Sequence, residues 1–176
     1  MIGKKRVKKM RLSKKLIGTA GAFAAALILY PILHECGHLA AARITGGGVV
    51  GFELFSRLCV ELRIQGNEKR MVFVGVCGGW FPMLLLFLPD RGSYYLYAVK
   101  LATAAAGFFC AVESVGHAVQ YLLGGMADAM DDAVILLRMF EGEKETVFLA
   151  LGIQAMTLAG FMIRTHPLKR TIWFLE

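Results

Sequence analysis

Two histidines and a glutamate at the end of a long apolar stretch are the residues best suited to do chemistry. The segment His34-Glu-Cys-Gly-His38 reads His-Glu-x-x-His. Residues four apart share one face of a helix, so both imidazoles can bind one metal ion while the Glu35 carboxylate lies beside it. Catalytic zinc typically has three protein ligands and a fourth position open to water. The pattern therefore predicts a zinc site, and the alternative is a hydrogen-bonded pair of core histidines with Glu35 as partner.

The same pattern predicts the chemistry of such a site. Bound zinc lowers the pKa of a water molecule, and Glu35 is placed to accept the proton of that water and pass it to a leaving amine. His34 and His38 are thus the predicted metal ligands and Glu35 the predicted catalytic base. Cys36 points away from the face shared by the histidines and is not counted as a ligand.

The setting of these residues is apolar. Of the 176 residues 57% are hydrophobic, and no charged residue occurs from Leu16 to Leu33. Ionisable groups are costly inside a membrane, and those found there usually have a function. We therefore interpret the histidines and Glu35 as functional rather than as filler.

The elements that must position them are membrane helices. Four apolar stretches are long enough to cross a bilayer at about 1.5 Å per residue. They are Leu16–Leu33, Met71–Pro89, Tyr94–Leu123 and Thr146–Ile163. The prediction is a mainly α, polytopic membrane protein of about four transmembrane helices, with one intramembrane domain over residues 16–163 between tails at 1–15 and 164–176.

The first helix is expected from about Ser13 to Ile44, bent at Pro31 and ended by Gly46-Gly47-Gly48. From Val49 to Gln65 apolar residues alternate with others, which predicts a short β-hairpin with its turn at Ser56-Arg57.

Less regular segments follow the hairpin. Gly66–Arg70 and Glu141–Glu145 are expected to be polar connections, and Met126–Phe140 a helix that carries three aspartates. The third apolar stretch is either one tilted helix or two pieces broken near Gly107.

The net charge of +7 is concentrated at the start of the chain. Eight basic residues between Lys4 and Lys15 precede the first apolar stretch, and Arg164, Lys169 and Arg170 follow the last one. Basic residues next to a membrane span indicate the cytoplasmic side and contact with anionic membrane lipid, not nucleic acid. Both termini are expected in the cytoplasm. The four cysteines form no C-x-x-C pair, which argues against disulfides and a cysteine zinc site.

The sequence His34-Glu-Cys-Gly-His38-Leu-Ala-Ala-Ala, on a membrane helix that precedes a Gly-rich, strand-like stretch, resembles the site-2 protease family of intramembrane metalloproteases. The similarity extends more weakly to Gly78-Gly79 and to the aspartates before the last span. It implies that the two histidines bind zinc, that Glu35 is the catalytic base, and that an aspartate on a later helix completes the site. It also implies substrates cut within or next to their own transmembrane helices.

The third ligand departs from that family, because neither Asn-x-x-Pro nor Asp-Gly occurs before the last span. Asp132 is the first choice, since a small residue and an apolar run follow it. Asp128 and Asp131 remain alternatives, and helix N-terminal capping explains the carboxylates that do not bind metal.

Glu113 and His117 form a second group of ionisable residues within an apolar stretch. They could join the metal site, or pair with each other or with Lys100. An internal hydrogen-bonded pair is the preferred interpretation.

The sequence thus predicts a zinc-dependent intramembrane endopeptidase that acts on a transmembrane protein or peptide. The alternative is a non-catalytic membrane scaffold of the same architecture that binds membrane partners without cleavage. An intact His-Glu-x-x-His favours the enzyme, because a scaffold has no need of Glu35. The sequence predicts neither the identity of the substrate nor the oligomeric state.

Overall fold

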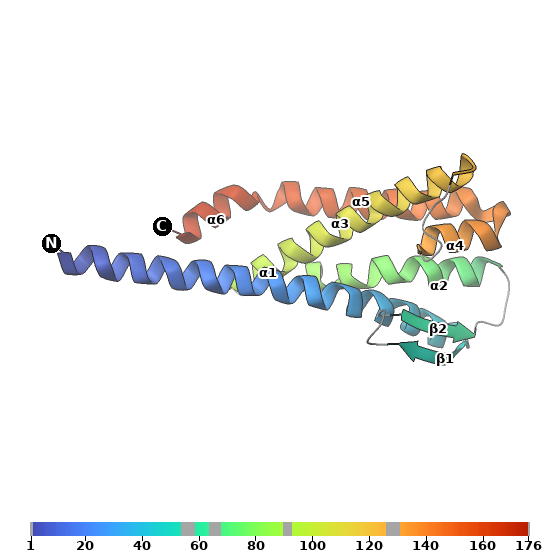
Figure 1. Ribbon diagram of the computed structural model, residues 1–176, viewed down its shortest axis with the longest axis horizontal. Helices are drawn as coiled ribbons and strands as arrows, with labels where there is room; N and C mark the ends of the chain where they lie inside the picture. Colours follow the sequence, from blue (N-terminus) through green and yellow to red (C-terminus); the bar gives the residue numbers. More distant parts are fainter. Residues whose placement is uncertain (1, 54–58, 64–67, 90–92, 126–130, 176) are drawn as a thin grey trace.

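The chain forms a bundle of long helices with a small β-hairpin on one side (Figure 1). The computed structural model describes residues 2–53, 59–63, 68–89, 93–125 and 131–175. The helices are α1 (Ile2–Ile44), α2 (Glu68–Trp80), the 3₁₀ helix η1 (Phe81–Phe87), α3 (Tyr94–Leu122), α4 (Asp132–Met139), the 3₁₀ helix η2 (Glu141–Glu143), α5 (Lys144–Arg164) and α6 (Pro167–Leu175). The hairpin consists of β1 (Gly48–Glu53) and β2 (Cys59–Arg63). The predicted fold class is confirmed.

Four helical segments among the described residues are long and apolar enough to cross a membrane. They are Ser13–Ile44, Glu68–Phe87, Tyr94–Leu122 and Lys144–Arg164. Each overlaps one of the four predicted spans, and the arrangement is compatible with an integral, multi-pass membrane protein.

Helix α1 carries the histidines and is longer than expected. It begins at Ile2 instead of Ser13 and runs without interruption through Pro31. It ends where Gly46 takes a positive φ of 81°, and the Gly47 N–H donates to the Ala42 carbonyl at 2.7 Å. Glycine takes this left-handed conformation at little cost, so the predicted glycine stop is confirmed.

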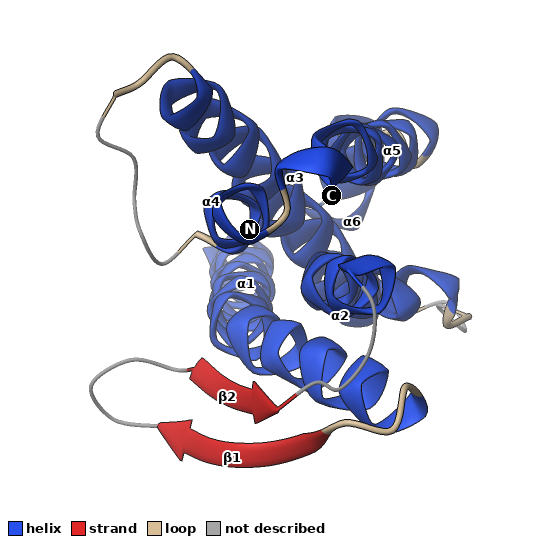
Figure 2. Cartoon of the chain, turned by 90° about the vertical axis from the view of Figure 1, so that its right-hand side faces the viewer, coloured by secondary structure: helices blue, strands red, loops and turns tan. Residues whose placement is uncertain are grey.

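The hairpin packs beside the C-terminal part of α1, on the side away from α3, α4 and α5 (Figures 1 and 2). Its strands are antiparallel, with Val49 opposite Leu62 and Phe52 opposite Val60. Leu62 of β2 packs against a small apolar cluster of Ala41, Ala42 and Val74. The predicted turn at Ser56-Arg57 lies outside the described residues.

Helix α2 approaches three other helices closely because glycines lie at the points of contact. A Cβ atom at Gly75 would meet Leu136 of α4, and one at Gly79 would meet the Gln154 amide of α5. On α1, a Cβ atom at Gly37 would collide with the Cys77 carbonyl of α2. Small residues permit such close helix contacts in membranes. At Phe81 the α-helix gives way to η1, next to Pro82, where the sequence predicted a bend.

The short helix α4 is held by an apolar cluster. Its buried Ala133, Leu136 and Leu137 pack with Val72 of α2 and Val147 of α5. Burial of this face compensates for the small number of backbone hydrogen bonds in an eight-residue helix.

Several predicted boundaries were wrong. Helix α2 already begins at Glu68, and Glu141–Glu145 forms η2 and the start of α5 instead of a loop. Polar side chains are compatible with the first turn of a helix, which explains both errors. The third stretch is the single helix α3 and does not break near Gly107. The predicted C-terminal tail, residues 164–176, contains helix α6. Residues 126–130 lie outside the described residues.

Candidate metal centre

Three side chains from two elements meet at one point. The Nε2 atoms of His34 and His38, both on α1, lie 3.1 Å apart. The Oδ2 atom of Asp132, the first residue of α4, lies 2.8 Å from His34 Nε2 and 3.0 Å from His38 Nε2. The helical spacing of the histidines brings their two imidazoles together. The packing of α4 against α2 and α3 then brings Asp132 to them.

These distances fit a shared metal ion. Two donors bound tetrahedrally at about 2.0–2.1 Å from one zinc ion lie about 3.3 Å apart. The observed separations of 2.8, 3.0 and 3.1 Å differ from that value by only a few tenths of an ångström. The donor set of two imidazoles and one carboxylate is also one that zinc accepts.

The orientation of His38 is fixed by the backbone of α2. Its Nδ1 atom lies 2.9 Å from the carbonyl oxygen of Val74. Since a carbonyl can only accept, Nδ1 donates this hydrogen bond. In the neutral ring, Nε2 would then carry the lone pair and face His34 and Asp132. A carbonyl that accepts from the ring nitrogen on the far side favours the imidazole tautomer required for metal binding.

Glu35 lies at the edge of the same group. A carboxylate oxygen of Glu35 and one ring nitrogen of each histidine all lie within 4.8 Å of one another, and the three residues form a group able to hold a metal ion. Glu35 is thus close enough to the imidazoles to act on a water molecule that a metal would hold there.

Gly78 of α2 closes the group from a third side. A Cβ atom at this position would collide with the His38 ring, and it would lie 2.8 Å from His34 Nε2. Only a residue without a side chain lets α2 pass this close to both imidazoles. The weak similarity at Gly78-Gly79 noted in the sequence thus coincides with a contact at the candidate metal centre.

The charge of Asp132 suits a ligand. Burial alone would raise the pKa of its carboxyl group, but the hydrogen bonds with His34 and His38 lower it by more. The pKa of Asp132 therefore lies well below its ordinary value. The carboxyl group is ionised, as metal binding requires.

Asp131 has a different partner set from Asp132. Its Oδ1 atom accepts hydrogen bonds from the N–H groups of Ala133 and Val134, so it caps α4. Its Oδ2 atom accepts from Ser114 Oγ at 2.8 Å and lies 3.2 Å from His117 Nδ1, both on α3. The third candidate, Asp128, lies outside the described residues.

The second group of ionisable residues does not join the histidines. Among the described residues, the group that could hold a metal contains neither Glu113 nor His117. His117 contacts Asp131 instead of Glu113, and Glu113 is exposed on α3. Lys100 donates to the carbonyl of Leu88. The expected Glu113–His117 pair is therefore wrong, because the partner of His117 comes from another helix.

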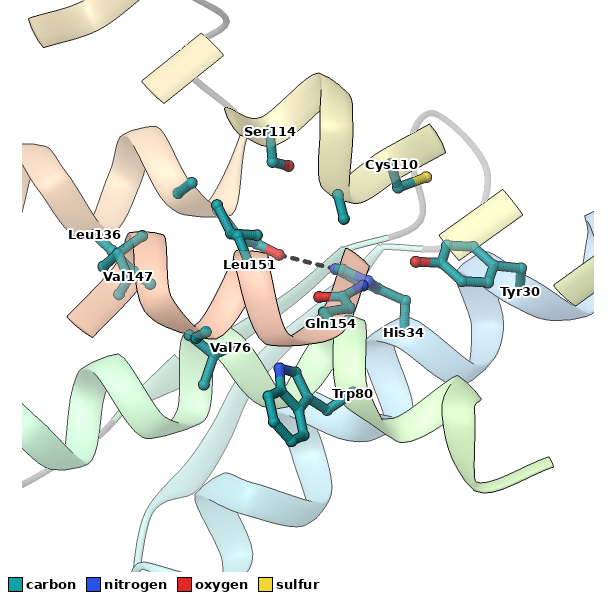
Figure 3. Close-up of a pocket in the computed structure, with 16 residues that line it drawn as sticks. Tyr30, His34, Val76, Trp80, Cys110, Ser114, Leu136, Val147, Leu151 and Gln154 are labelled. Carbon is teal, nitrogen blue, oxygen red and sulfur yellow. Dashed lines mark hydrogen bonds and ion pairs between the residues drawn. The ribbon is translucent and has the colours of Figure 1, made fainter. Parts of the chain in front are cut away.

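A small cavity lies beside the histidines and Asp132 (Figure 3). Its volume is about 40 Å³, and a water molecule needs about 10–15 Å³. It is lined mainly by apolar side chains of α2, α3, α4 and α5, together with Tyr30 and His34 of α1. The polar lining includes Gln154 and the indole of Trp80.

Sequence reasoning missed three of the polar lining residues: Tyr30, Trp80 and Gln154. Tyr30 could have been found, because it lies one helical turn before His34. Trp80 and Gln154 reach the cavity through the packing of α2 and α5, which no local spacing reveals.

Comparison of the chain with protein-family models, curated proteins and solved structures found no match.

Proposed function

We propose that this chain is a zinc-dependent intramembrane endopeptidase of the site-2 protease type. The observation that carries the proposal is the convergence of His34, His38 and Asp132, with the Glu35 carboxylate beside them, among helices long enough to span a membrane. Two imidazoles, one carboxylate and an adjacent base are the parts that metal-assisted peptide hydrolysis needs.

His34, His38 and Asp132 would hold the zinc ion, and catalytic zinc sites with three protein ligands keep one position for water. The cavity beside them has room for a water molecule, and its lining is mainly apolar. When bound, zinc would supply Lewis acidity, which lowers the pKa of the water.

The chain's own residues account for the proton transfers. Glu35 accepts the proton that the attacking water loses as the new C–O bond forms. It then donates this proton to the amine nitrogen as the C–N bond breaks, so that one peptide bond and one water yield a carboxylic acid and an amine. His34, His38 and Asp132 keep the metal in place during both steps.

The surroundings support a membrane-embedded substrate. The ligands lie on α1 and at the start of α4, within a bundle of four apolar helices (Figure 2). The cavity of about 40 Å³ is far below the roughly 300–1,000 Å³ of sites that hold organic ligands. We therefore propose that helices around the cavity separate to admit a polypeptide, as lids open in other enzymes.

The test is zinc content together with cleavage. The protein is purified in detergent without chelators and reconstituted in lipid vesicles with single-span peptides that carry a helix-destabilising glycine pair. Mass spectrometry then detects cleavage products. We expect about one zinc per chain in the wild type, loss of zinc in His34→Ala, and zinc without cleavage in Glu35→Gln, whose activity should fall about 10²–10⁴-fold.

His166→Ala is the matched control. His166 is exposed just beyond α5 and far along the chain from the ligands, so its loss should change neither zinc nor cleavage. Absence of zinc from the wild type would contradict the metal site. Zinc in the wild type without any cleavage would favour the non-catalytic scaffold.

A further inference from the structure

Tyr30 has a buried hydroxyl group without a hydrogen-bond partner. The residue is only 6% exposed, and its oxygen makes no hydrogen bond of ordinary geometry. The polar group beside it is the Cys110 thiol, a weak partner. A buried hydroxyl that gives up water without replacement costs free energy, which phenylalanine at the same place would avoid. Such a group calls for an explanation.

The direction of this hydroxyl supplies one. Tyr30 lies one turn before His34 on α1, and the centres of the two rings are 6.2 Å apart. Figure 3 shows the Tyr30 oxygen pointing into the cavity that His34 and Asp132 also line. The unused donor is thus aimed at the space beside the predicted metal ligands.

Two side chains of α3 that line the same cavity are less suited to donate a hydrogen bond there. The Ser114 hydroxyl already donates to Asp131. The Cys110 thiol lines the same cavity, but a thiol is a weak donor.

We propose that Tyr30 is a further catalytic residue, whose hydroxyl donates a hydrogen bond to the carbonyl oxygen of the peptide bond being cut. The proposal rests on the proposed endopeptidase function. As water adds to the carbonyl carbon, the π electrons of the C=O bond move to oxygen, which becomes negative. The Tyr30 O–H stabilises that charge without giving up its proton. When the C=O bond re-forms, the C–N bond breaks and the amine receives its proton from Glu35.

A donor aimed at the developing charge acts on the transition state more than on the bound substrate. Removing it should therefore lower kcat and leave KM nearly unchanged. Removing one such donor in other hydrolases costs about 10²–10³-fold in kcat.

The test compares Tyr30→Phe with Tyr97→Phe in the same vesicle assay. Tyr97 is the matched control, because its hydroxyl is also buried without a partner. Its ring is covered by the Arg170 guanidinium at 4.1 Å and does not line the cavity. We expect Tyr30→Phe to lower kcat about 100-fold with zinc content and KM unchanged and Tm not lowered. Tyr97→Phe should leave kcat, KM and zinc content unchanged, again with Tm not lowered.

An unchanged kcat in Tyr30→Phe, in a wild type that turns over, would overturn the role of Tyr30 alone. So would an equal loss in both variants, or a loss that accompanies loss of zinc. Absence of turnover in the wild type would overturn both this role and the endopeptidase function.

Discussion

At the scale of single residues, position 78 tolerates the least change, because only glycine leaves room for the two imidazoles beside it. A methyl group at this position would collide with the His38 ring and press on His34 Nε2. We predict that Gly78→Ala displaces the imidazoles and weakens zinc binding at least about tenfold, the range seen when groups that orient metal ligands are changed. Zinc affinity is measured by competition with a chelator of known affinity.

Gly160→Ala separates this steric effect from a general effect of alanine. Gly160 lies on α5, where a Cβ atom would meet nothing within 4 Å. Both substitutions should favour the helix by about 0.5–1 kcal/mol, because glycine loses more backbone freedom on folding. Equal zinc affinities in Gly78→Ala and Gly160→Ala would mean that α2 does not hold the histidines in place.

The residue scale is also where sequence reasoning went furthest. His34, Glu35 and His38 follow from spacing alone, since one helix fixes their relation. The choice among the aspartates was less secure, because Asp131 and Asp132 differ by only one step along the chain. The structure places Asp132 at the imidazoles and makes Asp131 the cap of α4. That division depends on where the helix begins, which is the least certain feature of any helix predicted from sequence.

At the scale of elements, the position of α4 determines whether Asp132 reaches the histidines. Asp131 caps this eight-residue helix and binds Ser114 of α3. We predict that Asp131→Ala lowers the free energy of unfolding by about 1 kcal/mol through loss of the cap. It should also weaken zinc binding about tenfold, because α4 is no longer tied to α3. Denaturant unfolding and chelator competition measure the two effects.

Glu143→Ala is the control for this prediction. Glu143 stands at the N-terminal end of α5. Its carboxylate accepts a solvent-exposed hydrogen bond from Thr146 and has no other described contact. Its removal should cost less than about 0.5 kcal/mol and leave zinc binding unchanged. If Asp131→Ala binds zinc as tightly as Glu143→Ala does, the contacts of α4 with α3 are not needed for the site.

The elements themselves were predictable to different degrees. Long apolar runs, a glycine stop and strand alternation identify the four spans and the hairpin, because each is a local pattern. Helix α6 was missed, since polar and apolar residues are mixed in Pro167–Leu175 and resemble a tail. The contact of His117 with Asp131 joins two helices, and no spacing within α3 predicts it.

At the scale of the whole molecule, the two ends of the chain lie at the same end of the bundle (Figure 1). Lys15 of α1 donates a hydrogen bond of 2.5 Å to the carbonyl of Phe174 in α6 and lies over its ring. Helix α1 has 43 residues, which at 1.5 Å per residue gives about 65 Å, roughly twice the hydrocarbon thickness of a bilayer. If α1 crosses a bilayer, its basic first turns would extend beyond the membrane, on the same side as α6.

This arrangement predicts that the two ends of α5 lie on opposite sides of the membrane, with the basic end in the cytoplasm. In a variant without Cys36, Cys59, Cys77 and Cys110, single cysteines replace Glu143 before α5 or Lys169 after it. We expect an impermeant maleimide to label Glu143→Cys in intact cells, and Lys169→Cys only once the cytoplasmic face is opened. Retained zinc shows that the cysteine-free protein is folded. Labelling of both positions from one side would show that α5 does not cross, and the reverse pattern would place the termini outside.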